Sequence, residues 1–152
     1  MSMDARQRNS HEWLYNRGVE LLRRGDRLRA FSMFERAYEI KPTAKCRSYL
    51  GMLTATERGL VKKGMDLCQA SINDEPGNPL HYLNLSKLLY CVERKGEAVD
   101  VVLKARGVGN SPEMDEWLMK VGIRKRPVFP FLTRRNPLNK YSGIMLKRIG
   151  LR

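Results

Sequence analysis

The chain has 152 residues, of which 42% are hydrophobic and 30% are charged, a composition that excludes wholesale disorder and is typical of a globular protein. Its first residues contain no apolar core for a signal peptide, and no apolar run approaches the roughly 18 residues of a membrane span. The cysteines, Cys46, Cys68 and Cys91, are odd in number and widely spaced, which argues against a disulfide framework or a zinc site. We therefore expect a cytoplasmic protein of one domain, with a tail.

The net charge of +13 is distributed unevenly along the chain. All 16 acidic residues lie at or before Glu116. The segment from Trp117 to Arg152 contains ten basic residues and no acidic one. Such a change in charge indicates a change of role along the chain.

Amphipathic segments of helical length follow one another from residue 11. Asn9 followed by Glu12 resembles a capping box at the start of the first helix. We expect helices at about 11–24, 27–40, 44–57, 61–73, 79–92 and 95–106. Ser111-Pro112-Glu113 predicts the start of a seventh helix, with a capping serine, proline in the first position and an acid in the first turn; this helix ends near Gly122.

Landmark residues recur with a period of 34. Gly25 falls on Gly59, Pro42 on Pro76 and Phe34 on Cys68, and small residues recur at 30, 64 and 98. The glycines suit left-handed turns between two helices, and each proline ends the second helix of a pair. The small residues let paired helices approach closely. One helical hairpin cannot bury its apolar face alone, so the pattern predicts stacked hairpins.

The segment from His11 to Ala44 resembles a tetratricopeptide repeat throughout. The matching positions of this repeat are Leu14, Gly18, Leu21, Gly25, Ala30, Phe34, Ala37 and Pro42. The resemblance implies an all-α, right-handed superhelix of three hairpins at 11–44, 45–78 and 79–112. A flexible N-terminus at 1–10 precedes them, and a capping helix at 113–122 and a basic extension at 123–152 follow. A match of this kind is a signal for fold and almost none for function.

The later repeats depart from this pattern. Leu50-Gly51 stands one residue early against the first repeat, which predicts a one-residue insertion later in that helix or its turn. The third repeat has Glu93 where the hairpin glycine is expected, and it lacks the terminal proline.

Tetratricopeptide hairpins, by resemblance, line a concave groove with their first helices. The one-residue insertion in the second repeat shifts the alignment of its two groove positions, Tyr49 and Met52. The clamp that some family members use for carboxylate termini is absent, because Tyr15, Val19, Leu80 and Asn84 occupy its positions. The alternative for the groove side chains is that they only pack between hairpins or against the basic extension. The predicted groove residues are Tyr15, Val19, Leu22, Tyr49, Met52, Leu83, Lys87 and Tyr90.

The basic extension admits three interpretations. Its aromatic residues could dock on the solenoid with the charges merely solvated, it could bind nucleic acid or an acidic protein, or its last helix could lie on an anionic membrane. The residues of the predicted anion-binding patch are Arg124, Lys125, Arg126, Arg134, Arg135, Lys140, Lys147 and Arg148.

No catalytic motif is present. The histidines, His11 and His81, stand at helix starts, and Cys68 and Cys91 fall on apolar helical positions typical of buried side chains. We expect no enzyme activity, no cofactor, no metal and no small-molecule substrate. The sequence predicts an adaptor or scaffold that holds a peptide or helix of a partner protein in the groove. The alternative is recruitment to nucleic acid or an anionic membrane through the tail, and an imperfect last repeat allows a homodimer.

Overall fold

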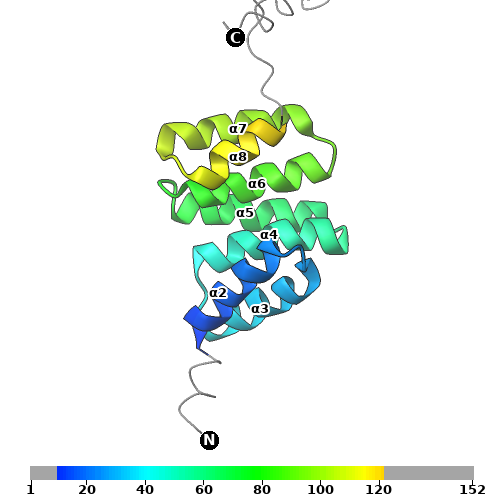
Figure 1. Ribbon diagram of the computed structural model, residues 1–152, viewed down its shortest axis with the longest axis vertical. Coiled ribbons are helices and arrows are strands. Elements are labelled where there is room, and N and C mark those ends of the chain that lie inside the picture. Colours follow the sequence, from blue (N-terminus) through cyan, green and yellow to red (C-terminus); the bar gives the residue numbers. More distant parts are fainter. Residues whose placement is uncertain (1–9, 122–152) are drawn as a thin grey trace, which may run out of the picture. The chain divides into compact units, whose positions relative to one another are not determined.

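The computed structural model describes residues 10–121, and these residues form seven α-helices and no strand (Figure 1). The predicted flexible N-terminus and basic extension, with its anion-binding patch, lie outside the described residues except for Ser10. The observed ends of the helices lie within two residues of the predicted ones. The helices are α2 (His11–Arg23), α3 (Arg27–Ile40), α4 (Ala44–Arg58), α5 (Val61–Asp74), α6 (Pro79–Cys91), α7 (Lys95–Val108) and α8 (Pro112–Val121).

Short polar side chains cap the start of most helices. Asp26, Thr43 and Asn78 each accept a backbone N–H from the first turn of α3, α4 and α6. The capping box predicted at Asn9 is wrong in register. Ser10 is the N-cap of α2, and its hydroxyl accepts the backbone N–H of Trp13.

Each of the three hairpin turns has a residue with left-handed backbone conformation, and these residues stand 34 positions apart. Gly25 has φ = 81°, Gly59 has φ = 67° and Glu93 has φ = 62°. Glu93 adopts this conformation although its Cβ makes it unfavourable. The missing glycine therefore does not change the turn.

The extra residue of the second repeat is accommodated at the end of α4. In the first and third hairpins, the backbone N–H groups of Asp26 and Arg94 bond to carbonyls five residues earlier, at Leu21 and Leu89. At the equivalent place Leu60 bonds to Thr54, six residues earlier. The last turn of α4 is thus one residue wider, which returns the chain to register at Gly59.

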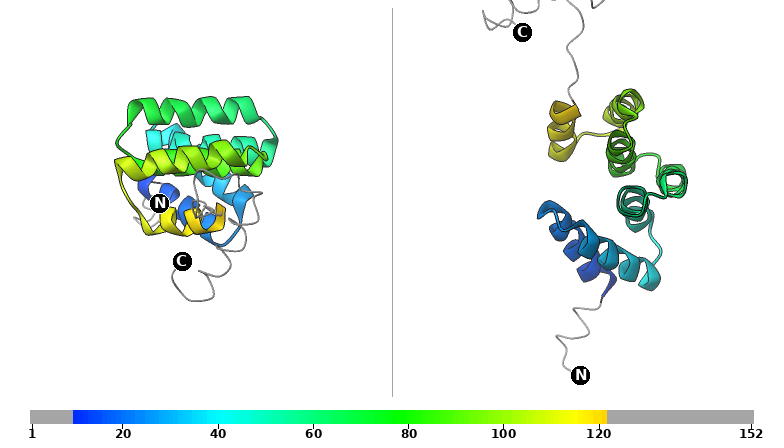
Figure 2. Two further views of the ribbon diagram at one scale, coloured as in Figure 1. Left: turned by 90° about the horizontal axis from the view of Figure 1, so that it is seen from above. Right: turned by 90° about the vertical axis from the view of Figure 1, so that its right-hand side faces the viewer.

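The helices pack in consecutive pairs, α2 with α3, α4 with α5 and α6 with α7, and each pair packs on the next. This arrangement confirms the predicted all-α solenoid. In the right-hand view of Figure 2 the helices follow a curved path, with the first hairpin and α8 on either side of its open side. The tightest pairing is between α4 and α5, where a Cβ added to Gly64 would lie 2.5 Å from the carbonyl oxygen of Gly51.

An aromatic cluster joins the first two hairpins. Phe34 is fully buried, and its ring stacks on that of Tyr49 at a centroid distance of 4.5 Å.

Cys46 and Cys68 are also buried, and burial raises the pKa of the Cys68 thiol to about 12. The prediction that Cys91 is buried is wrong. It is the last residue of α6, and its side chain is exposed because the chain turns away there.

Helix α8 covers the end of the third hairpin. Its apolar face consists of Met114, Trp117 and Leu118, which pack on Leu83 and Val102. Ser111 caps the helix by accepting the backbone N–H of Met114. Glu113, Glu116 and Met119 are exposed on the remainder of the helix, so α8 buries one side only.

His81 is a buried histidine at the junction between the second and third hairpins. Its Nε2 lies 3.1 Å from a carboxylate oxygen of Glu75, and its Nδ1 has no hydrogen-bond partner in the described residues. Burial lowers the pKa of His81, and the positive charges of Arg47 and Lys45 lower it further, while Glu75 acts in the opposite sense.

We expect the protein to lose stability as the pH falls through the range in which this histidine titrates. Because the pKa of His81 is lower in the folded state than the ordinary value of 6.5, its contribution to stability is present above that value and is lost as the pH falls. Urea unfolding between pH 7.5 and 5.5 should show a smaller decrease for His81→Gln, which keeps a donor for Glu75, than for the wild type. His11→Gln is the control for the loss of an imidazole elsewhere in the chain, and the decrease between the two pH values should match that of the wild type; equal decreases for all three proteins would refute the assignment.

Candidate binding site

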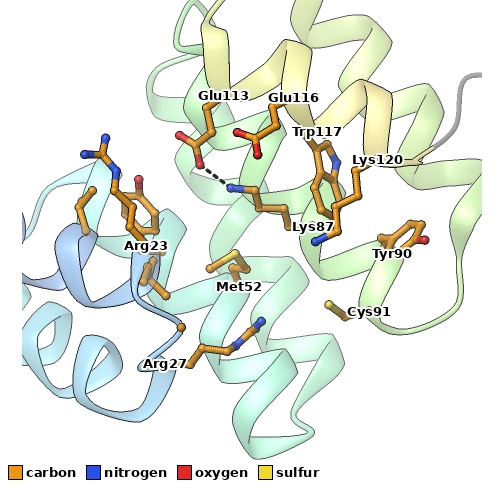
Figure 3. Close-up of a pocket in the computed structure, with 14 residues that line it drawn as sticks. Arg23, Arg27, Met52, Lys87, Tyr90, Cys91, Glu113, Glu116, Trp117 and Lys120 are labelled. Atoms are coloured by element: carbon orange, nitrogen blue, oxygen red, sulfur yellow. Dashed lines mark hydrogen bonds and ion pairs between the residues drawn. The ribbon is translucent and has the colours of Figure 1, made fainter.

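A hollow of about 510 Å³ lies between the first helices of the hairpins and α8, and we call it the inner hollow. Helix α2, the turn after it and the first residue of α3 form one wall, α4 and α6 form the floor, and α8 forms the other wall (Figure 3). The lining residues are Val19, Leu22, Arg23, Gly25, Arg27, Tyr49, Met52, Lys87, Tyr90, Cys91, Glu113, Glu116, Trp117 and Lys120.

The structure brings most of the predicted groove residues together. Val19, Leu22, Tyr49, Met52, Lys87 and Tyr90 all line the inner hollow.

The other two predicted groove residues lie elsewhere. Tyr15 packs edge-on against Phe34 and Tyr49. Leu83 is only 1% exposed, because Met114 and Trp117 of α8 cover it. These two side chains belong to the packing between helices rather than to the surface of the hollow.

The sequence prediction missed the wall that α8 contributes. Glu113, Glu116, Trp117 and Lys120 lie on this helix at spacings of three and four residues, so they share a face, and all four line the hollow. The spacing of these residues was a usable signal. The sequence predicts α8 as an end cap, and helical spacing does not show which neighbouring helices its faces meet.

Trp117 is held in a fixed orientation on this wall. Its indole N–H donates to the hydroxyl of Ser86 at 2.9 Å, and that hydroxyl donates to the carbonyl of Ala98 at 2.7 Å. The ring of Tyr90 meets the indole edge-to-face at 5.4 Å. The three contacts fix an aromatic surface before any ligand arrives, which lowers the entropy cost of binding.

The charged groups of the hollow are partly paired. The Lys87 amine lies 2.5 Å from a Glu113 carboxylate oxygen, and Arg27 contacts Glu57 at 2.5 Å and the Thr56 hydroxyl at 2.6 Å. The Lys120 amine lies 5.6 Å from the centroid of the Trp117 ring. Such cation–π contacts hold a lysine over an aromatic face without neutralising it.

Apolar and hydroxyl groups form the floor. Met52 and Tyr49 are buried beneath the opening, with 5% and 6% of their surfaces exposed. Burial raises the pKa of Tyr49, so its side chain remains a neutral hydroxyl. The hollow therefore presents apolar area together with a few fixed polar groups, which is the usual make-up of a ligand site.

The histidine side chains of residues 10–121 do not line the inner hollow. Within residues 10–121, no cluster of three His, Cys, Asp or Glu side chains could hold a metal ion. Both histidines lie away from the hollow: His81 contacts Glu75, and the Nδ1 of His11 lies 3.0 Å from the carbonyl oxygen of Ala37. None of the helices in the described segment is both long enough and apolar enough to cross a membrane.

Comparison with known proteins gives a likeness in structure only. No protein-family model matches the chain, and no curated protein matches it. The fold is similar to the crystal structure of the Sgt2 TPR domain from Aspergillus fumigatus, with a TM-score of 0.55 and 15% sequence identity. The similarity covers 93% of this chain and 83% of that one. At this identity the likeness supports the tetratricopeptide-like fold that the resemblance of residues 11–44 implied, and nothing more specific.

Proposed function

We propose that this protein is a non-catalytic interaction module that holds a peptide segment of a partner protein in the inner hollow. The observation that carries the proposal is the hollow itself, which is lined by apolar and aromatic side chains from α2, α4, α6 and α8. Tyr49 and Met52 are buried beneath the opening, and concave hollows with a mostly apolar lining are where proteins commonly hold ligands. Tyr90 and Trp117 supply the amphipathic contact area that is enriched at protein interfaces.

The fold and the cysteines are consistent with this proposal. A tetratricopeptide-like domain is a scaffold on which a partner can be held, as expected from the sequence. All three cysteines are free, and two are buried. We propose a reducing compartment, the cytoplasm, as the place where the module acts.

A charge placed on the α2 wall should weaken peptide binding. Leu22 is half-buried on this wall, so Leu22→Arg puts a guanidinium into the opening without emptying the core. Peptides selected from a random 12-residue display library on the full chain should bind this variant at least about tenfold more weakly, a loss of about 1.4 kcal/mol. Fluorescence anisotropy with the selected peptides measures the change.

The matched control is Leu103→Arg, because Leu103 is an exposed leucine of α7 that does not line the hollow. This variant should bind the peptides like the wild type. Equal affinity for wild type and Leu22→Arg would refute the proposal. Binding that survives Leu22→Arg and disappears between low and moderate salt would favour instead a charge-driven role for the basic residues 124–148.

A further inference from the structure

We propose that the first two hairpin turns bind the surface of an anionic phospholipid bilayer, with basic side chains on the lipid headgroups and exposed leucines inserted between them. We call this surface the turn edge, and it comprises residues 23–29 and 57–63. The inference does not depend on the proposed function, because the side chains that would contact lipid do not line the inner hollow. All of these side chains are exposed, and they are Arg24, Leu28, Arg29, Arg58, Leu60, Lys62 and Lys63.

Positive charge is concentrated at the first two hairpin turns. Residues 23–29 and 57–63 contain seven basic and two acidic residues. The equivalent segment of the third hairpin, 91–97, contains two of each. The balance is reversed at the other ends of the helices, where two basic and four acidic residues lie in the segments 39–45, 73–79 and 107–113. The charge is therefore polarised along the helix axes toward one edge.

Contacts between α3 and α4 join the two turns into one surface. Arg27, the first residue of α3, donates to a Glu57 carboxylate oxygen at 2.5 Å and to the Thr56 hydroxyl at 2.6 Å. The guanidinium of Arg58 lies 4.2 Å from the centroid of the Phe31 ring. Both turns lie on the side of the molecule where α2 and α4 end (Figure 1). Because Arg27 and Glu57 neutralise each other, the positive charge of the edge comes from its outer side chains.

The two lysines of the turn edge do not serve the folding of α5. The N-terminal end of a helix carries a partial positive charge, so basic side chains there are unfavourable. The first turn of α5 contains Lys62 and Lys63 and no acid, and neither lysine has an ion pair within residues 10–121. An external anion would offset this cost, and anionic headgroups supply negative charge over a whole surface.

The arginines of the turn edge are paired only with exposed acids. Arg24 pairs with Glu20 and Arg29 with Asp26, and the two arginine side chains are 65% and 78% exposed. Ion pairs at such exposure contribute little to stability. These arginines can therefore exchange their protein partners for headgroups at small cost.

Two leucines stand exposed among these cations. Leu28 is 71% exposed and Leu60 is 49% exposed. Leu60 is also the N-cap of α5 and makes no side-chain cap hydrogen bond, whereas Asp26, at the equivalent position of the first hairpin, caps α3. Leucine is among the least favourable N-cap residues. Departures from local folding rules are expected at functional positions, so this leucine indicates a contact with a partner.

Leucines beside cations favour a bilayer over a nucleic acid. Residues 23–29 and 57–63 contain no aromatic side chain on which a base could stack. In interfacial membrane contacts, apolar side chains enter the boundary between headgroups and acyl chains while basic side chains meet anionic lipid. The turn edge has both kinds of side chain.

The test is co-sedimentation of the full chain with phosphatidylcholine vesicles that contain or lack phosphatidylserine. The wild type should bind the anionic vesicles and not the neutral ones. Lys62→Gln combined with Lys63→Gln should weaken this binding at least about tenfold, because each basic residue near the surface adds to the attraction. Leu60→Asn should weaken it about fivefold through the lost apolar contact. Asparagine is a preferred N-cap residue, so this variant should keep the thermal stability of the wild type.

The matched controls make the same chemical changes outside the turn edge. Lys41→Gln combined with Lys104→Gln removes two exposed lysines, and Leu103→Asn removes an exposed leucine of α7. Both should bind the anionic vesicles within about twofold of the wild type.

Three results would overturn the inference. Equal weakening by the two lysine pairs would show a response to net charge alone. Unchanged vesicle binding by both turn-edge variants would place the lipid contact elsewhere in the chain. Binding of single-stranded RNA without binding of anionic vesicles would assign the edge to nucleic acid. None of these results affects the peptide binding proposed for the inner hollow.

Discussion

Replacing Phe34 with alanine should lower the free energy of unfolding by about 3–5 kcal/mol, the usual cost of deleting a buried phenylalanine ring. Phe34 has no exposed surface, and it lies where α2, α3 and α4 meet. A Cβ added to Gly18 of α2 would lie 2.8 Å from the ring, and Tyr49 of α4 stacks on it. The cavity left by alanine would therefore remove contacts to two neighbouring helices at once.

The loss is large relative to the total stability of a domain, which is about 5–15 kcal/mol. Chemical denaturation followed by circular dichroism measures it. Phe34→Leu is the control, because it keeps most of the volume and should cost less than about 1.5 kcal/mol. A Phe34→Ala protein as stable as the leucine variant would show that the ring is not a structural link between the first two hairpins.

Replacing Gly64 with alanine should destabilise the protein by about 2 kcal/mol, although alanine is a better helix former than glycine by about 1 kcal/mol. The added Cβ would lie 2.5 Å from the Gly51 carbonyl oxygen and 2.7 Å from the Cβ of Ala55. The carbonyl is backbone and cannot move aside, so α4 and α5 must separate. The steric cost exceeds the gain in helix propensity.

Gly107→Ala makes the identical chemical change inside α7, where nothing lies within 4 Å of the added Cβ. This variant should be more stable than the wild type by roughly 0.5 kcal/mol, through the helix propensity alone. Thermal unfolding of the pair separates the two effects by sign. If both variants were stabilised, the close approach of α4 and α5 would be refuted.

The packing at Phe34 and Gly64 also affects the proposed binding, because the walls of the inner hollow come from different hairpins. Val19 and Leu22 belong to the first hairpin, Met52 to the second and Tyr90 to the third. Their spacing is set by how the hairpins stack. A variant that moves α4 away from α5 or loosens α2 on α4 should therefore change the shape of the hollow without touching its lining.

The sequence alone determined the helices and their repeat, because these depend on local chemistry. Gly25 and Gly59 mark turns that require a left-handed residue, and Pro42 and Pro76 follow the ends of α3 and α5. The Leu50-Gly51 pair stands one residue early against the first repeat, and this indicated the extra residue that widens the last turn of α4.

The tertiary structure decided which side chains meet in the hollow. Leu83 and Lys87 are one turn apart on α6, yet α8 covers the first and leaves the second open to the hollow. Helical periodicity shows which residues share a face, but it does not show which neighbouring helix lies over that face. The packing of α8 on the third hairpin, fixed by Trp117 and Ser86, supplied that information, and it brought Lys120 and Arg27, 93 positions apart, to one site.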